Sequence, residues 1–186
     1  MGEHAITLLK EPGPGADGET PTFDELFNSH HEKVLRAAYR VTGNMADAED
    51  ILQTVFLRLL KRREQQVYRE SSAAYLRRAA INAGIDLLRS KHHSLSVSLN
   101  EDIHPSTLGG ADSEARQLEL RRHLREALLA LEPRAAEVVA LRYFEDFNNA
   151  EIAALLDTSP NTIAVTLHRA RTRLQEILGE LEGENR

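Results

Sequence analysis

Basic and polar side chains gather near the C-terminus of this 186-residue chain, in the stretch 148–178. Asn148 and Glu151 have the spacing of a capping box, and apolar residues at helical spacing follow them. Ser159 and Pro160 are a typical N-cap and first helical residue, so they predict a second, longer helix after a short turn. The exposed side of that second helix carries seven residues: Asn161, Thr162, Val165, His168, Arg169, Arg171 and Arg173.

These two helices predict a helix-turn-helix. The second helix has no acidic residue before Glu176, although the chain holds 29 Asp and Glu against 23 Lys and Arg and has a net charge of -6. The second helix of a DNA-binding helix-turn-helix lies in the major groove, where phosphate would repel carboxylates. An ordinary amphipathic helix pair with a solvated basic face is the alternative that these residues alone leave open.

A second basic segment lies at 72–91, where apolar spacing predicts a long helix. Asn82 and Asp86 are four residues apart and should share one face of it. Amide and carboxylate groups beside arginine suit hydrogen bonding to base edges, whereas a solvated basic face is the competing interpretation. The basic residues of this segment are Arg77, Arg78, Arg89 and Lys91.

An acidic cluster begins the helix predicted over residues 45–63. Asp47, Glu49 and Asp50 occupy its first turns, where the helix dipole favours acids. The dipole explains most of this pattern, but the three acids and Gln53 also form a docking face for a basic partner.

The remaining periodicity predicts an all-α fold of two small helical domains. Thr22 and Glu25 should cap a first helix that ends at Gly43, and Asn44 can cap the next. Helices are also predicted from Ser113 to about Leu131 and from Pro133. The predicted divisions are an N-terminal tail (1–21), a first domain (22–93), a flexible linker (94–112), a second domain (113–180) with four helices, and a C-terminal tail (181–186).

Composition excludes several classes of function. The chain has no cysteine, so disulfides, thiolate metal sites and cysteine nucleophiles are excluded. No membrane-length apolar run or signal core is present, which predicts a soluble cytoplasmic protein. No constellation for catalysis or cofactor binding is identifiable, so neither an enzyme nor a cofactor is expected. His30 and His31 should be solvated rather than bound to a metal. His92, His93 and His104 could bind a metal, but their surroundings have the ordinary composition of a linker, so no metal site is expected.

Three stretches in this order resemble the extracytoplasmic-function (ECF) RNA polymerase sigma factors, group four of the housekeeping-type sigma family. The region-two stretches are NMADAEDILQTVFLRLLKR and AAYLRRAAINAGIDLLRSKHH, and the region-four stretch is LEPRAAEVVALRYFEDFNNAEIAALLDTSPNTIAVTLHRARTRLQEIL. The resemblance implies a factor that binds core RNA polymerase, directs it to specific promoters and helps open the DNA.

The resemblance also implies roles for the residues of the first domain. Its second helix would dock on the clamp helices of the largest polymerase subunit through Asp47, Asp50, Gln53 and Thr54. The following helix would hold the non-template strand of the minus-ten element, and a flipped base would enter a pocket beside the 63–72 loop. The implied minus-ten residues are Tyr68, Tyr75, Arg77, Arg78, Asn82, Asp86 and Arg89.

The second domain would read the minus-thirty-five element. Asn161, Thr162, Val165, His168 and Arg169 would contact bases or phosphates, and Arg171 and Arg173 would meet phosphate or the polymerase flap. The sequence departs from the family where Ala164, Val165 and Thr166 follow Thr162-Ile163, which favours apolar readout. Asp157 stands in place of a turn glycine, and the 144–149 bridge also lacks one.

The family further implies an anti-sigma factor as a partner, no membrane insertion and a monomer when no partner is bound. The residues leave two other classes of function open. A conventional helix-turn-helix regulator would need a dimer interface or ligand pocket, and neither is visible. A sigma-mimicking adaptor that binds a regulator would keep the acidic docking face without needing both basic helices.

Overall fold

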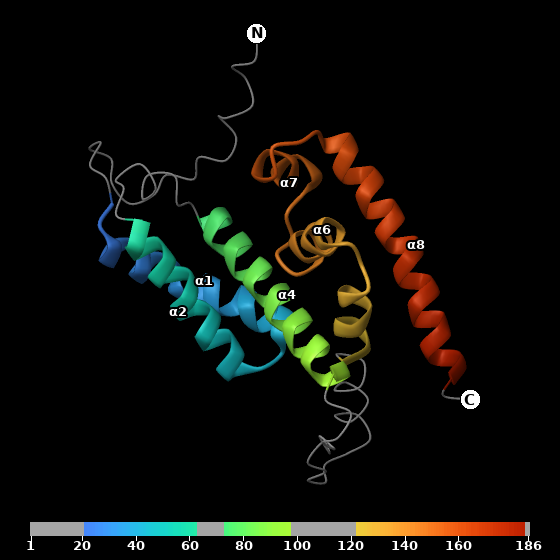
Figure 1. The fold of residues 1–186 in the computed structure, drawn as a ribbon. Coiled ribbons are helices and arrows are strands. Elements are labelled where there is room, and N and C mark those ends of the chain that lie inside the picture. Colours follow the sequence, from blue (N-terminus) through green and yellow to red (C-terminus); the bar gives the residue numbers. More distant parts are fainter. Residues whose placement is uncertain (1–20, 63–72, 98–121, 185–186) are drawn as a thin grey trace, which may run out of the picture.

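The computed structural model describes residues 21–62, 73–97 and 122–184, and within these ranges every regular element is a helix (Figure 1). The first domain consists of α1 (Phe23–Thr42), α2 (Met45–Arg62) and α4 (Ala73–Val97). The second consists of a helical segment at 122–129, α6 (Pro133–Tyr143), α7 (Asn149–Leu155) and α8 (Pro160–Glu184). The predicted all-α fold of two helical domains is confirmed. The predicted N-terminal tail lies outside the described residues except for residue 21, and so does most of the linker. The predicted C-terminal tail (181–186) is partly wrong, because α8 continues through residues 181–184.

The ends of α1 follow from its capping residues. The Thr22 hydroxyl accepts a hydrogen bond of 3.3 Å from the Glu25 N–H, and the Glu25 carboxylate accepts one of 2.8 Å from the Thr22 N–H. Gly43 ends the helix in the left-handed region at φ 67°, and its N–H donates to the Tyr39 carbonyl at 2.7 Å. The side-chain oxygen of Asn44 then accepts from the Asp47 N–H at 3.1 Å. All three predicted helix ends are confirmed.

The core of the first domain joins one apolar face from each of its helices. The rings of Phe27 and Phe56 meet edge to face with centroids 4.9 Å apart. Gly84 lets α4 approach α1 closely, because a Cβ there would lie 3.0 Å from a methyl carbon of Val41. The buried residues include Leu26, Val34, Val41, Ile51, Val55, Phe56, Leu59, Leu76, Ile81 and Ile85.

The helix α4 is longer than the sequence predicts. It continues to Val97, whereas the pattern placed its end near Lys91 and the linker from residue 94. The apolar periodicity ends where the helix leaves the core, but no proline or glycine occurs between Gly84 and Pro105 to stop the helix. Extending an existing helix costs little per residue, so the backbone hydrogen bonds continue past the last packed turn.

In the second domain, α6, α7 and α8 each contact the other two helices, and their buried residues form one hydrophobic cluster with those of the first domain. The largest fully buried side chains there are Leu141, Ile152, Ile163 and Val138. The predicted start of α6 at Pro133 is confirmed. In the part of the chain that the structure describes, no helix is long and apolar enough to cross a membrane.

The two domains pack against each other through α4 and α6. In Figure 1, α4 lies between the α1–α2 pair and α6, so one side of α4 faces its own core and another faces the second domain. This placement decides which of the predicted functional residues are accessible.

Candidate nucleic-acid interface

Two capping arrangements define the helix-turn-helix. The Asn148 side-chain oxygen accepts hydrogen bonds from the N–H groups of Ala150 at 2.9 Å and Glu151 at 3.0 Å. The Glu151 carboxylate in turn accepts from the Asn148 N–H at 2.7 Å. At the start of α8, the Ser159 hydroxyl accepts from the Thr162 N–H at 3.1 Å. Both predicted caps are confirmed, and they fix where α7 and α8 begin.

The turn between these helices depends on an aspartate. Asp157 adopts φ 50°, in the left-handed region that favours glycine. Short polar side chains tolerate this conformation better than most other residues. The Thr158 N–H then donates to the Ala153 carbonyl at 2.9 Å, which closes the turn. The prediction that the turn tolerates Asp157 is therefore confirmed.

The two sides of α8 differ sharply in exposure. Ile163 and Leu167 are buried against α6 and α7, at 1% and 3% exposed. The predicted contact residues lie on the opposite side, and Val165 remains 42% exposed. Each of the seven is exposed: Asn161, Thr162, Val165, His168, Arg169, Arg171 and Arg173. The packed side thus orients α8, and the other side is accessible to a ligand.

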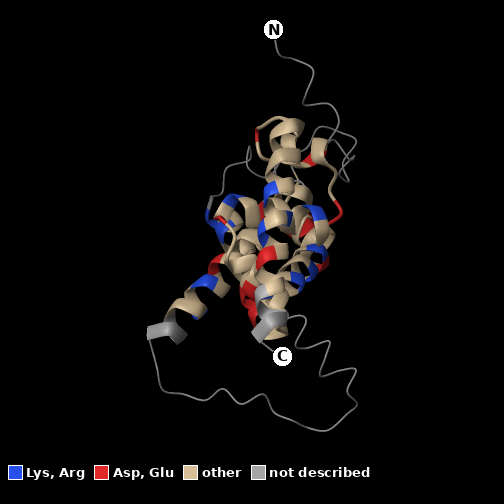
Figure 2. Ribbon diagram, turned by 90° about the vertical axis from the view of Figure 1, so that its right-hand side faces the viewer, with Lys and Arg blue, Asp and Glu red and all other residues tan. Residues whose placement is uncertain are grey.

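The arginines near the middle of α8 have neighbours of their own. Arg171 donates a 2.6 Å hydrogen bond from Nε to the Tyr143 hydroxyl and lies over that ring at 5.8 Å from its centroid. Arg173 pairs with Glu176 at 3.0 Å. Figure 2 shows basic segments in blue along the side of the molecule that includes α8. Tyr143, which the sequence did not single out for this role, orients Arg171 from the end of α6.

The predicted minus-ten face of α4 is in a different state, because the second domain covers it. Arg78 donates from Nη1 to the Leu155 carbonyl at 2.9 Å, and Arg89 donates from Nη2 to the Leu131 carbonyl at 2.9 Å. The Arg77 guanidinium lies over the Phe147 ring, 4.4 Å from its centroid. The structure brings these α4 residues together, but it places protein groups against them.

A buried carboxylate on α6 is central to this contact. Glu137 is 6% exposed, and its Oε1 accepts from Arg78 Nε at 2.7 Å and from Asn82 Nδ2 at 2.8 Å. Its Oε2 accepts from Arg134 Nη1 at 3.1 Å. Burial raises the pKa of Glu137, but the hydrogen bonds from Arg78 and Asn82 and the charges of Arg78 and Arg134 outweigh burial. The net pKa lies below its ordinary value.

A second carboxylate supports the same contact from the bridge between α6 and α7. The side chain of Glu145 is 4% exposed and accepts from Arg40 at 3.0 Å and from Arg77 at 3.2 Å. Arg40 also donates to the carbonyl of Phe144. The adjacent Asp146 adopts φ 57°, so this bridge also uses aspartate where the family commonly has glycine. The sequence singled out neither Glu137 nor Glu145, since glutamate side chains are ordinarily exposed.

Two other described minus-ten candidates, Asp86 and Tyr75, are exposed. Asp86 is exposed although Asn82, four residues earlier, is half-buried against Glu137. The side chain of Tyr75 is 37% exposed. Tyr68 and the loop expected to form the base pocket lie outside the described residues.

The predicted polymerase-docking face lies on α2. Asp50 and Gln53 are exposed and Thr54 is half-buried. Asp47 is paired with Lys91 of α4 at 2.7 Å, and 17% of its side chain is exposed. Leu57, which is 52% exposed, extends this side of α2 by one turn. The face therefore combines carboxylate, amide and apolar groups, one of which is already engaged within the chain.

The prediction of solvated histidines is wrong for α1. His30 Nδ1 is buried without a hydrogen-bond partner, and burial together with Lys33 lowers the His30 pKa. His31 stacks on Phe27 at 5.0 Å between centroids, and its Nδ1 lies 2.9 Å from the Phe27 carbonyl oxygen. Their positions beside the helix's apolar stripe explain both contacts. Over the described ranges, no group of three His, Cys, Asp or Glu side chains could hold a metal.

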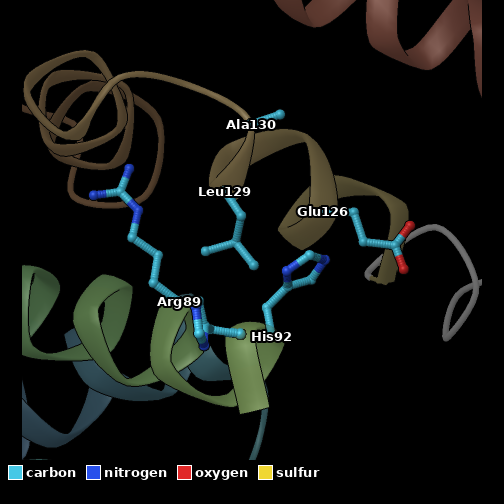
Figure 3. A pocket seen from close by; sticks show the side chains of 6 residues that line it. Arg89, His92, Glu126, Leu129 and Ala130 are labelled. Atoms are coloured by element: carbon cyan, nitrogen blue, oxygen red, sulfur yellow. The ribbon is translucent and has the colours of Figure 1, made fainter. Parts of the chain in front are cut away.

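An open recess of about 320 Å³ lies where the C-terminal part of α4 passes the 122–129 segment (Figure 3). Arg89, His92 and His93 line it from α4, and Glu126 and Leu129 line it from the facing segment. His92 and His93 are exposed. The domain contact is therefore close around Glu137 and Glu145 and looser at this end.

Comparison with known proteins identifies the two halves of the chain. The family description "Sigma-70 region 2" matches residues 26–93, and "Sigma-70, region 4" matches residues 121–174. The RNA polymerase sigma factor CarQ of Myxococcus xanthus is 36% identical over 90% of this chain and 95% of its own length. The ECF RNA polymerase sigma factor SigM of Mycobacterium tuberculosis H37Rv is 32% identical over 88% of this chain and 81% of its own. The chain belongs to the ECF sigma factors.

Solved structures of sigma factors share the fold. The structure of CnrH in complex with the cytosolic domain of CnrY aligns with a TM-score of 0.53 and 22% identity, covering 88% of this chain and 91% of the other. The RpoE sigma factor of Bartonella quintana, crystallised with the anti-sigma factor NepR, aligns with a TM-score of 0.50 and 23% identity over 84% and 96% of the two chains.

As an ECF sigma factor, the chain is an initiation factor that directs RNA polymerase to specific promoters. Region two then corresponds to α1, α2 and α4, and region four to the helices from 122 onward. The two basic helices of this sigma factor, α4 and α8, therefore lie in different regions of the family fold.

Proposed function

We propose that this sigma factor contacts promoter DNA with α8 at the minus-thirty-five element and with α4 at the minus-ten element. The observation that carries the proposal is the exposed side of α8, which is free of carboxylates from Pro160 to Gln175 and is oriented by a buried opposite side. Asn161, Thr162 and Val165 lie in its first turns, which enter the major groove in a helix-turn-helix. Val165 supplies an apolar group suited to a thymine methyl.

Reconstituted transcription tests this assignment. The purified chain is mixed with bacterial core polymerase and a library of promoter fragments, and the transcripts are sequenced. We expect new start sites that share two upstream elements. Start sites without a shared upstream element, or binding to core without initiation, would contradict promoter recognition and favour an adaptor.

Substitution on α8 separates recognition from general activity. Arg169→Ala is expected to lower transcription from the selected promoters by roughly tenfold, the effect of losing one good base or phosphate contact. Gln175→Ala is the matched control, because Gln175 is exposed on the same helix beyond the basic residues. Equal effects of the two substitutions would exclude Arg169 as a contact.

We infer that α2 docks on core polymerase through Asp47, Asp50, Gln53 and Thr54. Exposed acidic and amide groups on one side of α2 support this, since they complement a basic and polar partner surface. Asp50→Arg should weaken binding of the labelled chain to core polymerase, measured by fluorescence anisotropy. Glu32→Arg on α1 makes the same charge change at another exposed site and should leave binding unchanged.

An anti-sigma factor is proposed as a further partner, because the aligned Bartonella sigma factor was crystallised with one. In this proposal the polymerase performs the catalysis, and the chain acts with it in the bacterial cytoplasm. Affinity purification of the tagged chain from its native cell, followed by mass spectrometry, tests for such a partner. Recovery of polymerase subunits alone would count against it.

A further inference from the structure

The face of α4 proposed to hold promoter DNA is already occupied by groups that resemble DNA in charge. Two carboxylates from the second domain, Glu137 and Glu145, lie against it with side chains 8% and 4% exposed. A carboxylate and a phosphate both present anionic oxygens that accept charge-assisted hydrogen bonds from arginine. The arginines therefore make the kind of contact with the second domain that they would make with a DNA strand.

The overlap with the proposed DNA-binding residues is extensive. Glu137 accepts from Arg78 and Asn82, and Glu145 accepts from Arg77. Arg89 donates to the backbone of the second domain at Leu131. Four of the seven proposed minus-ten residues thus use polar groups for contacts within the chain.

The aromatic group in this contact strengthens the comparison with a nucleic acid. Phe147 is 6% exposed, and its ring lies beneath the Arg77 guanidinium. Arginine stacks on flat rings, including both aromatic side chains and bases. The Glu145 carboxylate and the Phe147 ring thus offer Arg77 the kinds of contact that a phosphate and a base would offer.

We propose that the second domain of the free chain inhibits the first: Glu137 and Glu145 cover the anion-binding face of α4, so single-stranded promoter DNA binds there only after the domains separate. This inference rests on the proposed role of α4 in DNA binding. The partner that opens the contact would be core polymerase, because docking of the two domains at separate polymerase sites would pull α6 away from α4. The open recess beside His92 shows that the domain contact is less close at one end.

The absence of cysteine from the natural chain makes domain opening measurable. Glu32→Cys on α1 and Gln175→Cys on α8 place two labels at exposed sites for fluorescence resonance energy transfer. We expect high transfer in the free chain and a clear loss of transfer in the Glu137→Gln, Glu145→Gln double variant. The Asp24→Asn, Glu132→Gln double variant removes the same two charges at exposed sites at the start of α1 and preceding α6, and it should leave transfer unchanged.

DNA binding is measured on the same proteins with a fluorescein-labelled pool of short single-stranded DNA of randomised sequence. The double variant should bind roughly tenfold more tightly than the natural chain, because a larger fraction is in the open state. The Asp24→Asn, Glu132→Gln control corrects for the change in net charge, because it also removes two negative charges. Unchanged transfer in the double variant, or opening without tighter DNA binding than the control, would overturn the inhibition.

A variant on the other side of the contact separates opening from DNA binding. Arg78→Gln should also lower energy transfer, since it removes the partner of Glu137, but should not raise DNA affinity because it also removes a DNA-binding group. Circular dichroism establishes that each variant retains its helices. Transcription by the natural chain with core polymerase tests the proposed function independently. Promoter-specific initiation together with unchanged energy transfer in the Glu137→Gln, Glu145→Gln variant would therefore reject only the inhibition.

Discussion

The helices α4 and α8 both carry arginines along one side, yet one side is covered and the other is open. Arg77, Arg78 and Arg89 of α4 contact carboxylates, a ring and carbonyl groups of the second domain. On α8 the side bearing Arg169 and His168 is exposed. In the free chain, a minus-thirty-five element could therefore reach its proposed helix directly, whereas a minus-ten strand would first have to displace protein.

The difference in accessibility between α4 and α8 arises from the groups that surround each helix rather than from the helices themselves. Glu137 and Glu145 lie on α6 and on the bridge that follows it, and both point toward α4. The neighbour of Arg171 on α8 is Tyr143, which is uncharged and 47% exposed. A basic helix is thus a potential DNA site in either case, and the neighbouring element determines whether the site is accessible.

Substitutions on the buried and exposed sides of α8 should show the largest difference in their effect on the free energy of unfolding. Ile163→Ala removes a side chain that is 1% exposed and should lower the free energy of unfolding by about 3 kcal/mol. Val165→Ala, two residues away on the exposed side, should change it by less than about 0.5 kcal/mol. Urea denaturation measures both. Similar losses from the two substitutions would contradict the assignment of one packed and one open side.

The stability of the contact between α4 and the second domain should depend on Glu137, the buried acid of α6. Glu137→Ala leaves Arg78, Asn82 and Arg134 without their shared acceptor and should cost about 2 kcal/mol, below the full value for a buried pair because the arginines are partly exposed. Glu132→Ala at an exposed position is the control, with an expected change within about 0.5 kcal/mol. Equal changes in the urea midpoint would show that the acid does not stabilise the contact.

Low pH should weaken the contact between α4 and the second domain through the Glu137 carboxylate. The pKa of Glu137 in the folded chain lies below its ordinary value of 4.5, since Arg78 and Asn82 from α4 and Arg134 from α6 favour the ionised form. Its stabilising contribution is therefore complete above the ordinary pKa and is lost as the pH falls through the lowered one. The difference in unfolding free energy between the natural chain and Glu137→Gln should shrink over that acidic range. A difference that stays constant with pH would contradict the assigned ionisation.

Sequence reasoning located the helices and their caps because those signals are local. Thr22 with Glu25, Asn148 with Glu151, and Ser159 with Pro160 each act within a few residues, and the structure contains all three arrangements. The exposed side of α8 was also predictable, since its apolar residues recur at helical spacing and leave the basic ones on the other side.

The contact between the domains could not be predicted in the same way. Glu137 is separated from Arg78 by 59 residues and Glu145 from Arg77 by 68, so no periodic pattern links them. Glu137 is surrounded in sequence by Ala136, Val138 and Val139, and such a neighbourhood could have marked a glutamate on a buried helix. The burial of His30 Nδ1 was missed as well, because the pattern of apolar residues along α1 does not mark it.

Two aspartates have a left-handed backbone conformation, one in each region that is compared. Substituting them should have the smallest effects. Asp157 adopts φ 50° in the helix-turn-helix, whereas Asp146 adopts φ 57° next to Glu145 in the domain contact. Glycine at either position should change the unfolding free energy by only about 0.5 kcal/mol, because relief of backbone strain is offset by the greater entropy of the unfolded chain. Ala164→Gly in the exposed middle of α8 is the control and should cost about 1 kcal/mol.

Their effects on DNA binding should differ even though their effects on stability are similar. Asp146→Gly loosens the bridge that positions Glu145 and should raise affinity for single-stranded DNA by about twofold through a small shift toward the open state. Asp157→Gly acts within the second domain and should leave that affinity unchanged. If both glycine variants raised the affinity equally, the increase would follow from lost charge rather than from the domain contact, and the contrast between the covered and open helices would lose its support.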